Sequence, residues 1–248
     1  MSLLSVRNVT KVFEREKIIL DNISLDLEEN DITFILGSNG AGKTTLLQIL
    51  LGLIEKQEGD ILFEGKKLNY PLSNEFKRKI GYVSDQPLLI EYLTALENLE
   101  YISFIYNVKY TQNDFIEILQ RYGLMDVDDK LVKNFSRGMR TKLNLCFLDI
   151  IDPMVIYMDE PTIGLDVMSI QYLTSKILEY KKNGKTLLIT SHDMAFVMQL
   201  AEHIYILHGG IIKRMNDLKV NSSNSLKAFN EYIQSEIKTM NGDIENDF

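Results

Sequence analysis

A glycine-rich stretch between an apolar run and a helix-like run constrains this chain more than any other feature. The segment from Ile32 to Leu36 is apolar, and Gly37, Gly42, Lys43 and Thr44 match the pattern G-x-x-x-x-G-K-[ST]. That pattern is typical of a loop that joins a buried strand to a helix and binds phosphate. Because both flanking runs are present, an ordinary strand-to-helix turn explains the stretch less well.

The residues of this loop suit a nucleotide phosphate. Glycines 37, 40 and 42 allow backbone angles and a close approach that a Cβ blocks, so successive N–H groups can point at phosphate oxygens. The lysine can bridge the β- and γ-phosphates, the first threonine can offer a hydroxyl to Mg²⁺, and the following helix directs its positive end at the anion. The predicted nucleotide-binding residues here are Asn39, Gly40, Ala41, Gly42, Lys43, Thr44 and Thr45.

Composition limits the class of protein. The chain has 248 residues, of which 45% are hydrophobic, so it can bury a core in one large or two small domains. The net charge of −8 gives no overall attraction for nucleic acid or an anionic membrane surface. A single cysteine, Cys146, lies in an apolar stretch, so we expect a buried thiol, no internal disulfide and a reducing compartment.

Neither a signal peptide nor a membrane span is expected. The first residues alternate like a strand, and no run approaches the ~18 apolar residues that a membrane helix needs. The sequence therefore predicts a soluble chain that can still dock on a membrane component.

The hydrophobic pattern predicts a layered α/β fold. Alternation at residues 4–9 and 23–27 predicts antiparallel strands, with Phe13 in the connection between them. Further strands are expected at residues 59–63, 80–83, 155–158 and 186–190, a helix through residues 170–180 that ends at Asn183-Gly184, and a final hairpin at residues 204–212. Helical spacing between about residues 88 and 151 indicates an inserted helical subdomain.

The C-terminal tail has its own helical pattern. From residue 222 onward, one helix face is expected to carry Leu226, Phe229, Ile233, Ile237 and Met240. Such a face packs either on its own domain or against a partner, and the pattern does not choose between them.

Two acids follow the apolar run at residues 154–158. Ligands of doubly wound sheets bind at the C-terminal ends of the strands, so Asp159 and Glu160 are expected beside the phosphate loop. The first acid can hold the Mg²⁺ shell, and the second can polarise a water for attack on the γ-phosphate. Alone, two acids after a strand are more often a solvated loop end; together with the loop they indicate phosphoryl transfer.

Together with the phosphate loop and the two acids, further segments make the chain resemble the ATP-binding-cassette ATPases over about residues 2 to 215. Gln86, in the segment from Tyr82 to Pro87, is similar to the family's Q-loop glutamine. The segment from Phe135 to Arg140 resembles the family signature, Asp166 after Gly164-Leu165 resembles the D-loop, and His192 resembles the switch histidine. Taken singly, each of these residues is more often packing or solvent-facing, but their order makes coincidence improbable.

The resemblance implies a role for each matching residue. Glu160, His192 and Gln86 are expected to be catalytic, and Thr44, Gln86 and Asp159 are expected to hold Mg²⁺. Phe13 is expected to stack on adenine, and Ser136, Gly138 and Asp166 are counted among the nucleotide contacts, the first two from the opposite subunit. The implied fold is a P-loop NTPase core with an N-terminal antiparallel β subdomain and the inserted helices, in a domain of residues 1–215 followed by a helical tail at 216–248.

The signature departs from the family's usual Leu-Ser-Gly-Gly-Gln. Phe135 replaces the leucine, Arg137 the first glycine and Met139 the glutamine. This version resembles the branch of export-type transporters for drugs, peptides, lantibiotic or bacteriocin immunity, or ions.

The sequence is compatible with three classes of function. The resemblance implies an energy-coupling subunit at the inner face of the cell membrane, in which two cassettes enclose two ATP molecules and drive a separate transmembrane permease. A soluble cassette ATPase acting on ribosomes, DNA or cluster assembly fits less well, because there is one phosphate loop and no long coiled-coil insertion. A binding module without turnover is disfavoured by Glu160 and His192. Cargo, direction and a homo- or heteromeric dimer stay open.

In related transporters the membrane partner inserts a short helix between the core and the helical subdomain. The apolar residues expected at this wall are Leu88, Leu89, Ile90, Tyr92, Tyr101, Phe104, Ile105 and Tyr106. Any one of them is about as readily explained as a core residue, so the expectation is that a subset is exposed.

Overall fold

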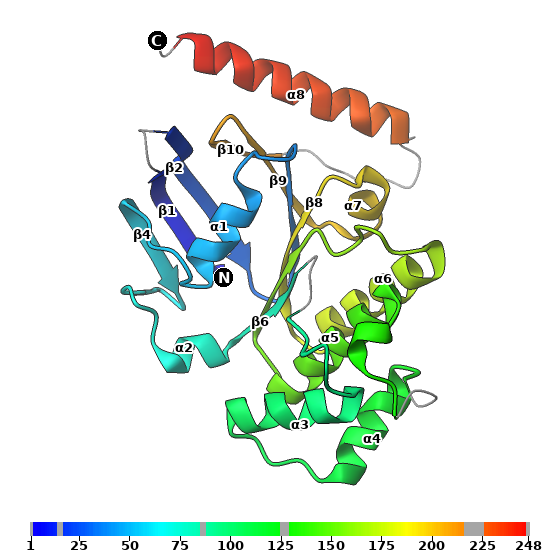
Figure 1. Cartoon of the computed structure of the whole chain (residues 1–248). Coiled ribbons are helices and arrows are strands. Elements are labelled where there is room, and N and C mark those ends of the chain that lie inside the picture. The colour runs from blue at the N-terminus through cyan, green and yellow to red at the C-terminus, as the bar shows by residue number, and fades with distance from the viewer. Residues whose placement is uncertain (1, 14–16, 85–87, 125–128, 216–225, 247–248) are drawn as a thin grey trace.

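A six-stranded sheet with the order β10-β9-β3-β8-β7-β6 forms the centre of the computed structural model (Figure 1). The structure describes every residue except 1, 14–16, 85–87, 125–128, 216–225 and 247–248. The strands are β3 (Ile32–Leu36), β6 (Ile80–Val83), β7 (Val155–Asp159), β8 (Thr186–Ser191), β9 (His203–His208) and β10 (Ile211–Arg214). All neighbours pair in parallel except β9 and β10. Covered on both faces, β3, β7 and β8 are buried throughout, as their continuous apolar sequences predict.

A smaller antiparallel sheet contains the N-terminus. Its order is β2-β1-β4-β5, with β1 at Ser2–Phe13, β2 at Lys17–Glu28, β4 at Glu58–Phe63 and β5 at Lys66–Lys67. The predicted antiparallel pair is confirmed, but both strands are longer than the alternation indicated. Phe13 was placed wrongly: it is the last residue of β1 and pairs with Lys17. Register shifts along the β1–β2 pair break the alternation, which hid the ends of these strands from the sequence pattern.

The helices lie on either side of the central sheet and at its two ends. They are α1 (Lys43–Leu50), α2 (Asn74–Arg78), α3 (Ala95–Tyr106), α4 (Gln112–Arg121), the 3-10 turn η2 (Val132–Asn134), α5 (Arg137–Ile151), α6 (Val167–Lys182), α7 (Met194–Leu200) and α8 (Leu226–Asn246). Figure 1 shows the small sheet and α1 on one side, α5 and α6 on the other, and α3 and α4 together at one end. None of the helices in the described ranges is long and apolar enough to cross a membrane.

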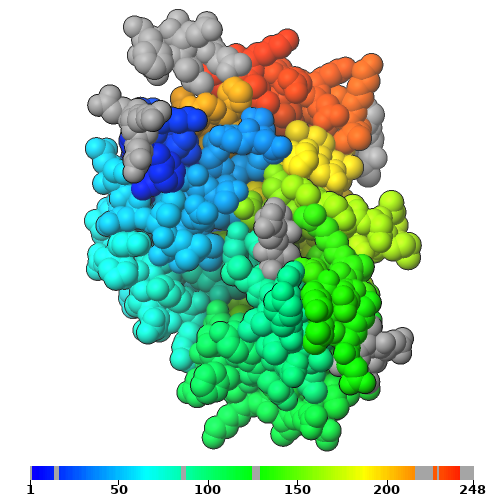
Figure 2. Space-filling model, in the orientation of Figure 1, coloured from blue at the N-terminus to red at the C-terminus, as the bar shows by residue number. Residues whose placement is uncertain are grey.

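The helical region after β6 begins at well-defined caps. Thr94 and Thr111 each accept a hydrogen bond from the backbone three residues on, and Glu97 and Asp114 accept one from the threonine N–H in return. These reciprocal capping boxes fix the starts of α3 and α4. In Figure 2 the green helical region adjoins the cyan part of the chain that includes β4 and α2.

Two apolar cores lie on the two faces of the central sheet. One contains α1, the antiparallel sheet and residues of the sheet such as Ile35 and Tyr157. The other contains α3 to α8 and the alternate residues, such as Phe34 and Met158. The phosphate-loop helix α1 is therefore held between two sheets, whereas the helical region packs on the opposite face.

The tail helix α8 packs on its own chain. Phe229, Ile233 and Met240 are buried in the same core as α7 and β9, and Glu236 forms an ion pair with Lys213 of β10 at 2.9 Å. Leu226 was expected on this face but is 45% exposed, because it lies in the first, least covered turn of the helix.

Ile233→Ala should release α8 from the body of the protein. Removing this buried side chain is expected to cost about 2–5 kcal/mol of packing free energy, so the amides of α8 should exchange hydrogen faster. Gln234→Ala changes the neighbouring exposed position and is the control that should leave exchange unchanged. Equal protection of α8 in both variants would contradict this packing.

Candidate active site

The loop between β3 and α1 has a backbone that requires glycine. Gly42 caps α1 with φ of 104°, and a Cβ there would lie 2.9 Å from Leu20 Cδ2 and 3.0 Å from the Ile19 oxygen. A Cβ on Gly37 would lie 2.5 Å from the backbone oxygen of Leu207. The loop is therefore pressed against β2 and β9, with no room for a side chain at either glycine.

Lys43 reaches back across this loop. Its ammonium donates to the backbone oxygens of Gly37 at 2.7 Å and Ser38 at 3.2 Å, and it lies 3.0 Å from Glu160 Oε1. That oxygen is buried and accepts no aligned hydrogen bond from the described residues, so its contact with the ammonium is an ion pair. Both side chains are buried, and a buried charge is stable only when an opposite charge compensates it, so Lys43 and Glu160 stabilise each other.

Asp159 is held by two hydroxyl groups at the end of β7. Thr44 Oγ1 donates to its Oδ2 at 2.8 Å, and Thr190 Oγ1 donates to its Oδ1 at 2.5 Å. The carboxylate can accept from both because an ionised carboxylate has only acceptor sites. The start of α1, the end of β7 and the end of β8 therefore meet at one acid.

Glu160 turns away from the line of β7 into the site. Its backbone adopts a left-handed conformation with φ of 47°, and its N–H donates to both the Oγ1 and the backbone oxygen of Thr190, at 3.0 and 3.1 Å. Its Oε2 lies 2.8 Å from His192 Nδ1 and accepts from the His192 N–H at 3.2 Å. The carboxylate thus lies between a lysine and a histidine.

A cavity of about 250 Å³ opens over the loop and extends to Glu160. It is lined by Phe13, Ile19, Ser38, Asn39, Gly40, Ala41, Gly42, Lys43, Thr44, Thr45 and Glu160. Phe13 is 43% exposed, and the Lys11 ammonium lies 5.0 Å from its ring centre. The structure therefore brings every predicted loop residue and the predicted adenine-stacking residue to one cavity.

The signature and D-loop residues lie at helix starts instead. Ser136 Oγ accepts from the Met139 N–H at 3.2 Å and caps α5, and Asp166 Oδ1 accepts from the Ser169 N–H at 2.7 Å and caps α6. The hydrogen bond from Ser169 lowers the pKa of the Asp166 carboxyl. Among the described residues that line the cavity, none comes from these two segments, so one chain does not bring them to its own loop.

One predicted site residue is not placed by the structure, and one residue of the site was not predicted. Gln86 lies outside the described residues. Thr190 was not predicted, although it orients Asp159 and binds the backbone of Glu160. Its only sequence signal is a polar residue at the end of an apolar strand, which is too common to single out.

Comparison with known proteins agrees with the class of protein that the fold indicates. The family model described as "ABC transporter" matches residues 20–163. The lantibiotic transport ATP-binding protein SrtF of Streptococcus pyogenes is 33% identical over 210 residues, which is 85% of this chain and 89% of that protein. The SkfA peptide export ATP-binding protein SkfE of Bacillus subtilis is 30% identical over 222 residues, covering 89% of this chain and 90% of that protein.

Solved structures share the fold. A nucleotide-free ATP-binding cassette from an ABC transporter superposes with a TM-score of 0.77 at 25% identity, covering 89% of this chain and 93% of the other. A dimeric post-hydrolysis cassette bound to ADP and Pi has a TM-score of 0.76 at 27% identity, covering 87% of this chain and 99% of the other.

The fold, the loop cavity and the acids at the end of β7 define a nucleotide-binding P-loop ATPase of the cassette type. This chain belongs to the ABC transporter family as an ATP-binding subunit.

Thr190→Val should impair turnover while leaving the fold intact. Valine keeps the shape but removes the donor to Asp159 and the acceptor of the Glu160 N–H, a loss of about 1–3 kcal/mol, or roughly 5- to 150-fold in kcat/KM. Thr186→Val is the matched control, because Thr186 is equally buried on β8 and its hydroxyl accepts from the Asn30 N–H, away from the cavity. Steady-state phosphate release that falls equally in both variants would contradict this role.

Proposed function

We propose that this chain is one of two cassettes in a transporter of the export type. It hydrolyses ATP and thereby drives a separate transmembrane subunit. The observation that carries the proposal is the buried Glu160 carboxylate, placed between Lys43 and His192 beside the loop cavity. We assign the ATPase domain to residues 1–215, with the inserted helical subdomain at about 88–151, and the tail to 216–248.

The loop residues suit the phosphates of ATP. Asn39, Gly40, Gly42, Thr44 and Thr45 line the cavity at the start of α1, where their backbone N–H groups and the ammonium of Lys43 can supply donors and positive charge; the Ala41 N–H donates to the Ser38 oxygen at 3.2 Å. When phosphates enter, the Lys43 ammonium can turn from Glu160 to them, which frees the Glu160 carboxylate. Phe13 presents an apolar ring at the rim for adenine.

Mg²⁺ fits the oxygen atoms of Thr44 and Asp159. A hydroxyl and a carboxylate oxygen are already 2.8 Å apart there, and Mg²⁺ prefers such hard ligands together with water and phosphate oxygens. The described residues contain no group of three or more acidic, histidine or cysteine ligands, which agrees with an ion held partly by the substrate. The ion would neutralise developing phosphate charge; Gln86, as the third assigned ligand, rests on the family resemblance.

Glu160 is assigned as the base for the attacking water. Its carboxylate lies next to the loop cavity and can accept a proton once Lys43 no longer neutralises it. His192 holds the free oxygen of Glu160 through both its ring and its backbone N–H, so it fixes the orientation of the base and can donate to the γ-phosphate. Charge neutralisation and positioning by these groups are what phosphoryl transfer requires.

The position of Ser136, Gly138 and Asp166 supports a dimer. They lie at helix starts away from the cavity of their own chain, so in our proposal a second cassette brings their counterparts to the nucleotide. The similar solved cassette with ADP and Pi is dimeric. The names of SrtF and SkfE, which refer to lantibiotic transport and peptide export, support an export-type system.

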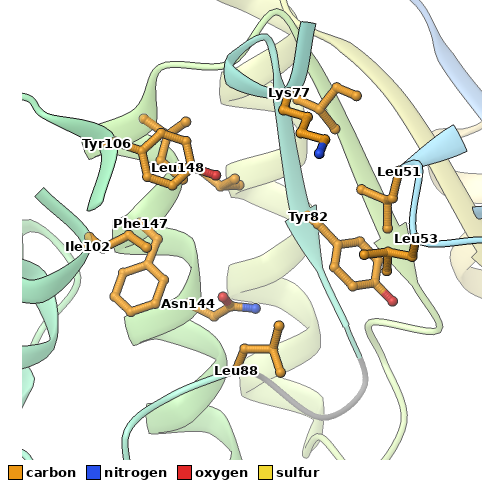
Figure 3. Close-up of a pocket in the computed structure, with 12 residues that line it drawn as sticks. Leu51, Leu53, Lys77, Tyr82, Leu88, Ile102, Tyr106, Asn144, Phe147 and Leu148 are labelled. Atoms are coloured by element: carbon orange, nitrogen blue, oxygen red, sulfur yellow. The ribbon is translucent and has the colours of Figure 1, made fainter. Parts of the chain in front are cut away.

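A groove beside the helical subdomain supports docking of the membrane subunit, which would hold the chain at the inner face of the membrane. Figure 3 shows a cavity with Leu51, Leu53 and Tyr82 on one side and Ile102, Tyr106 and Phe147 on the other; its volume is about 300 Å³. Of the residues expected at this wall, five are exposed: Leu88, Tyr92, Tyr101, Phe104 and Ile105. Leu89, Ile90 and Tyr106 are half-buried.

Glu160→Gln should bind ATP but lose most turnover, because an amide keeps the shape and cannot accept the proton. ATP should then hold the protein as a dimer in size-exclusion chromatography with Mg²⁺, while phosphate release falls. Glu117→Gln, at an exposed position of α4, is the control and should behave as the unmodified protein. Near-normal phosphate release by the Glu160 variant would remove it from this role.

Leu88→Asp and Phe104→Asp should abolish co-purification with the transmembrane subunit, identified from the neighbouring reading frame. Hydrolysis of Mg²⁺-ATP by the free subunit should stay largely unchanged, because neither residue lines the loop cavity. Leu178→Asp alters an equally apolar exposed residue on α6 and should retain the complex. An intact complex with every one of these variants would place the docking surface elsewhere, whereas no complex with the unmodified protein would favour an ATPase not coupled to transport.

A further inference from the structure

The starts of α5 and α6 touch each other within one chain. A Cβ built on Gly138 would lie 2.5 Å from Ser169 Oγ, and Ser169 is the residue whose N–H Asp166 caps. The signature segment and the D-loop segment are therefore packed together before any second chain arrives.

Arg137 makes a second contact between the same two segments. A Cβ built on Gly164 would lie 2.8 Å from the Arg137 Nη1 and 3.0 Å from its Cδ and Cζ. The arginine side chain thus lies directly against the backbone of Gly164. Gly164 also has φ of 68°, a conformation that favours glycine, and a Cβ there would have to displace the end of the arginine side chain.

The charge of Arg137 is not placed to stabilise its own helix. It is the first residue of α5, where the helix dipole is positive, and the first turn of α5 contains no acidic residue. A cation at this end costs helix stability. The contact with Gly164 therefore points to a role for the side chain outside α5.

We infer that Arg137 is a positioning residue that fixes the D-loop against the start of the signature helix. Ser136 caps α5 and Asp166 caps α6, so each helix start is ordered locally, and Arg137 joins the two starts across Gly164. The two segments then meet the nucleotide of the second cassette as one rigid unit. This inference rests on the proposed dimer, and it gives a physical role to the arginine that replaces the usual signature glycine.

A double-mutant cycle between Arg137→Ala and Gly164→Ala tests the contact. Arg137→Ala should lower kcat about tenfold and change KM less than about twofold, because chemistry depends on alignment more than ground-state nucleotide binding does. Gly164→Ala displaces the arginine and should lower kcat at least as much. The double variant should match Gly164→Ala alone, because both changes remove one contact.

Two controls separate positioning from a general loss of stability. Gly184→Ala introduces a side chain at a similar φ of 78° with no atom within 4 Å, so it reports backbone strain alone and should leave kcat unchanged. Arg137→Lys keeps the aliphatic stem over Gly164 and should give a kcat between those of the alanine variant and the unmodified protein. Additive effects of the two alanine changes on kcat, or an unchanged kcat in Arg137→Ala, would overturn the inference.

The dimer itself is tested separately in the Glu160→Gln background. If Glu160→Gln forms the ATP-dependent dimer, the proposed dimer stands, and the kcat cycle alone decides the inference on Arg137. If Glu160→Gln stays monomeric in ATP, the proposed dimer fails. In that case, thermal unfolding of the four proteins of the cycle tests the contact between Arg137 and Gly164 in the monomer. Additive shifts in Tm would overturn the inferred contact, and non-additive shifts would support it.

Discussion

The ion pair between Lys43 and Glu160 is the interaction on which the site depends. It buries two charges, and burial of charge is tolerated only when the partners are placed accurately and bonded further. Lys43 gains two backbone oxygens of its own loop, and Glu160 gains the N–H and ring of His192. The ammonium of the phosphate loop and the Glu160 carboxylate therefore neutralise each other. In the function proposed above, phosphate would take the place of the carboxylate, so nucleotide binding and activation of the proposed base would share one group, Lys43.

The central sheet makes this pair possible. Lys43 follows β3 and Glu160 follows β7, and these strands are separated by β8 rather than adjacent. Because the three strands are parallel, their carboxyl ends lie at one edge. Thr190, near the end of the intervening β8, fills the gap with a hydroxyl that donates to the Asp159 carboxylate and accepts from the Glu160 backbone N–H. The two apolar cores fix this edge from both faces, since α1 packs on one side and α5 and α6 on the other.

Much of the fold follows from local pattern. β6 has the predicted bounds, β7 and β8 each extend one residue beyond the prediction, and the hairpin of β9 and β10 forms where glycines interrupt two apolar runs. Elements without a long period were missed: α2 spans five residues and β5 two, too few for a 3.6- or 2-residue repeat to show. α7 was missed as well, because its seven residues are nearly all apolar and show no polar face. The extent of β1 was underestimated because bulges disturb its alternation.

The sequence by itself determined the phosphate loop, the acids after β7 and the order of the family segments, because glycine, lysine and carboxylate spacing within one segment is a local property. Only the tertiary structure decided that Lys43 pairs with Glu160, that Thr190 supports both acids, and that Arg137 lies on Gly164. These contacts join residues far apart along the chain, and they arise from strand order and from the packing of helix starts. The same holds for α8. The sequence predicts its apolar face, but only the structure shows that this face packs on the core beside α7 and β9.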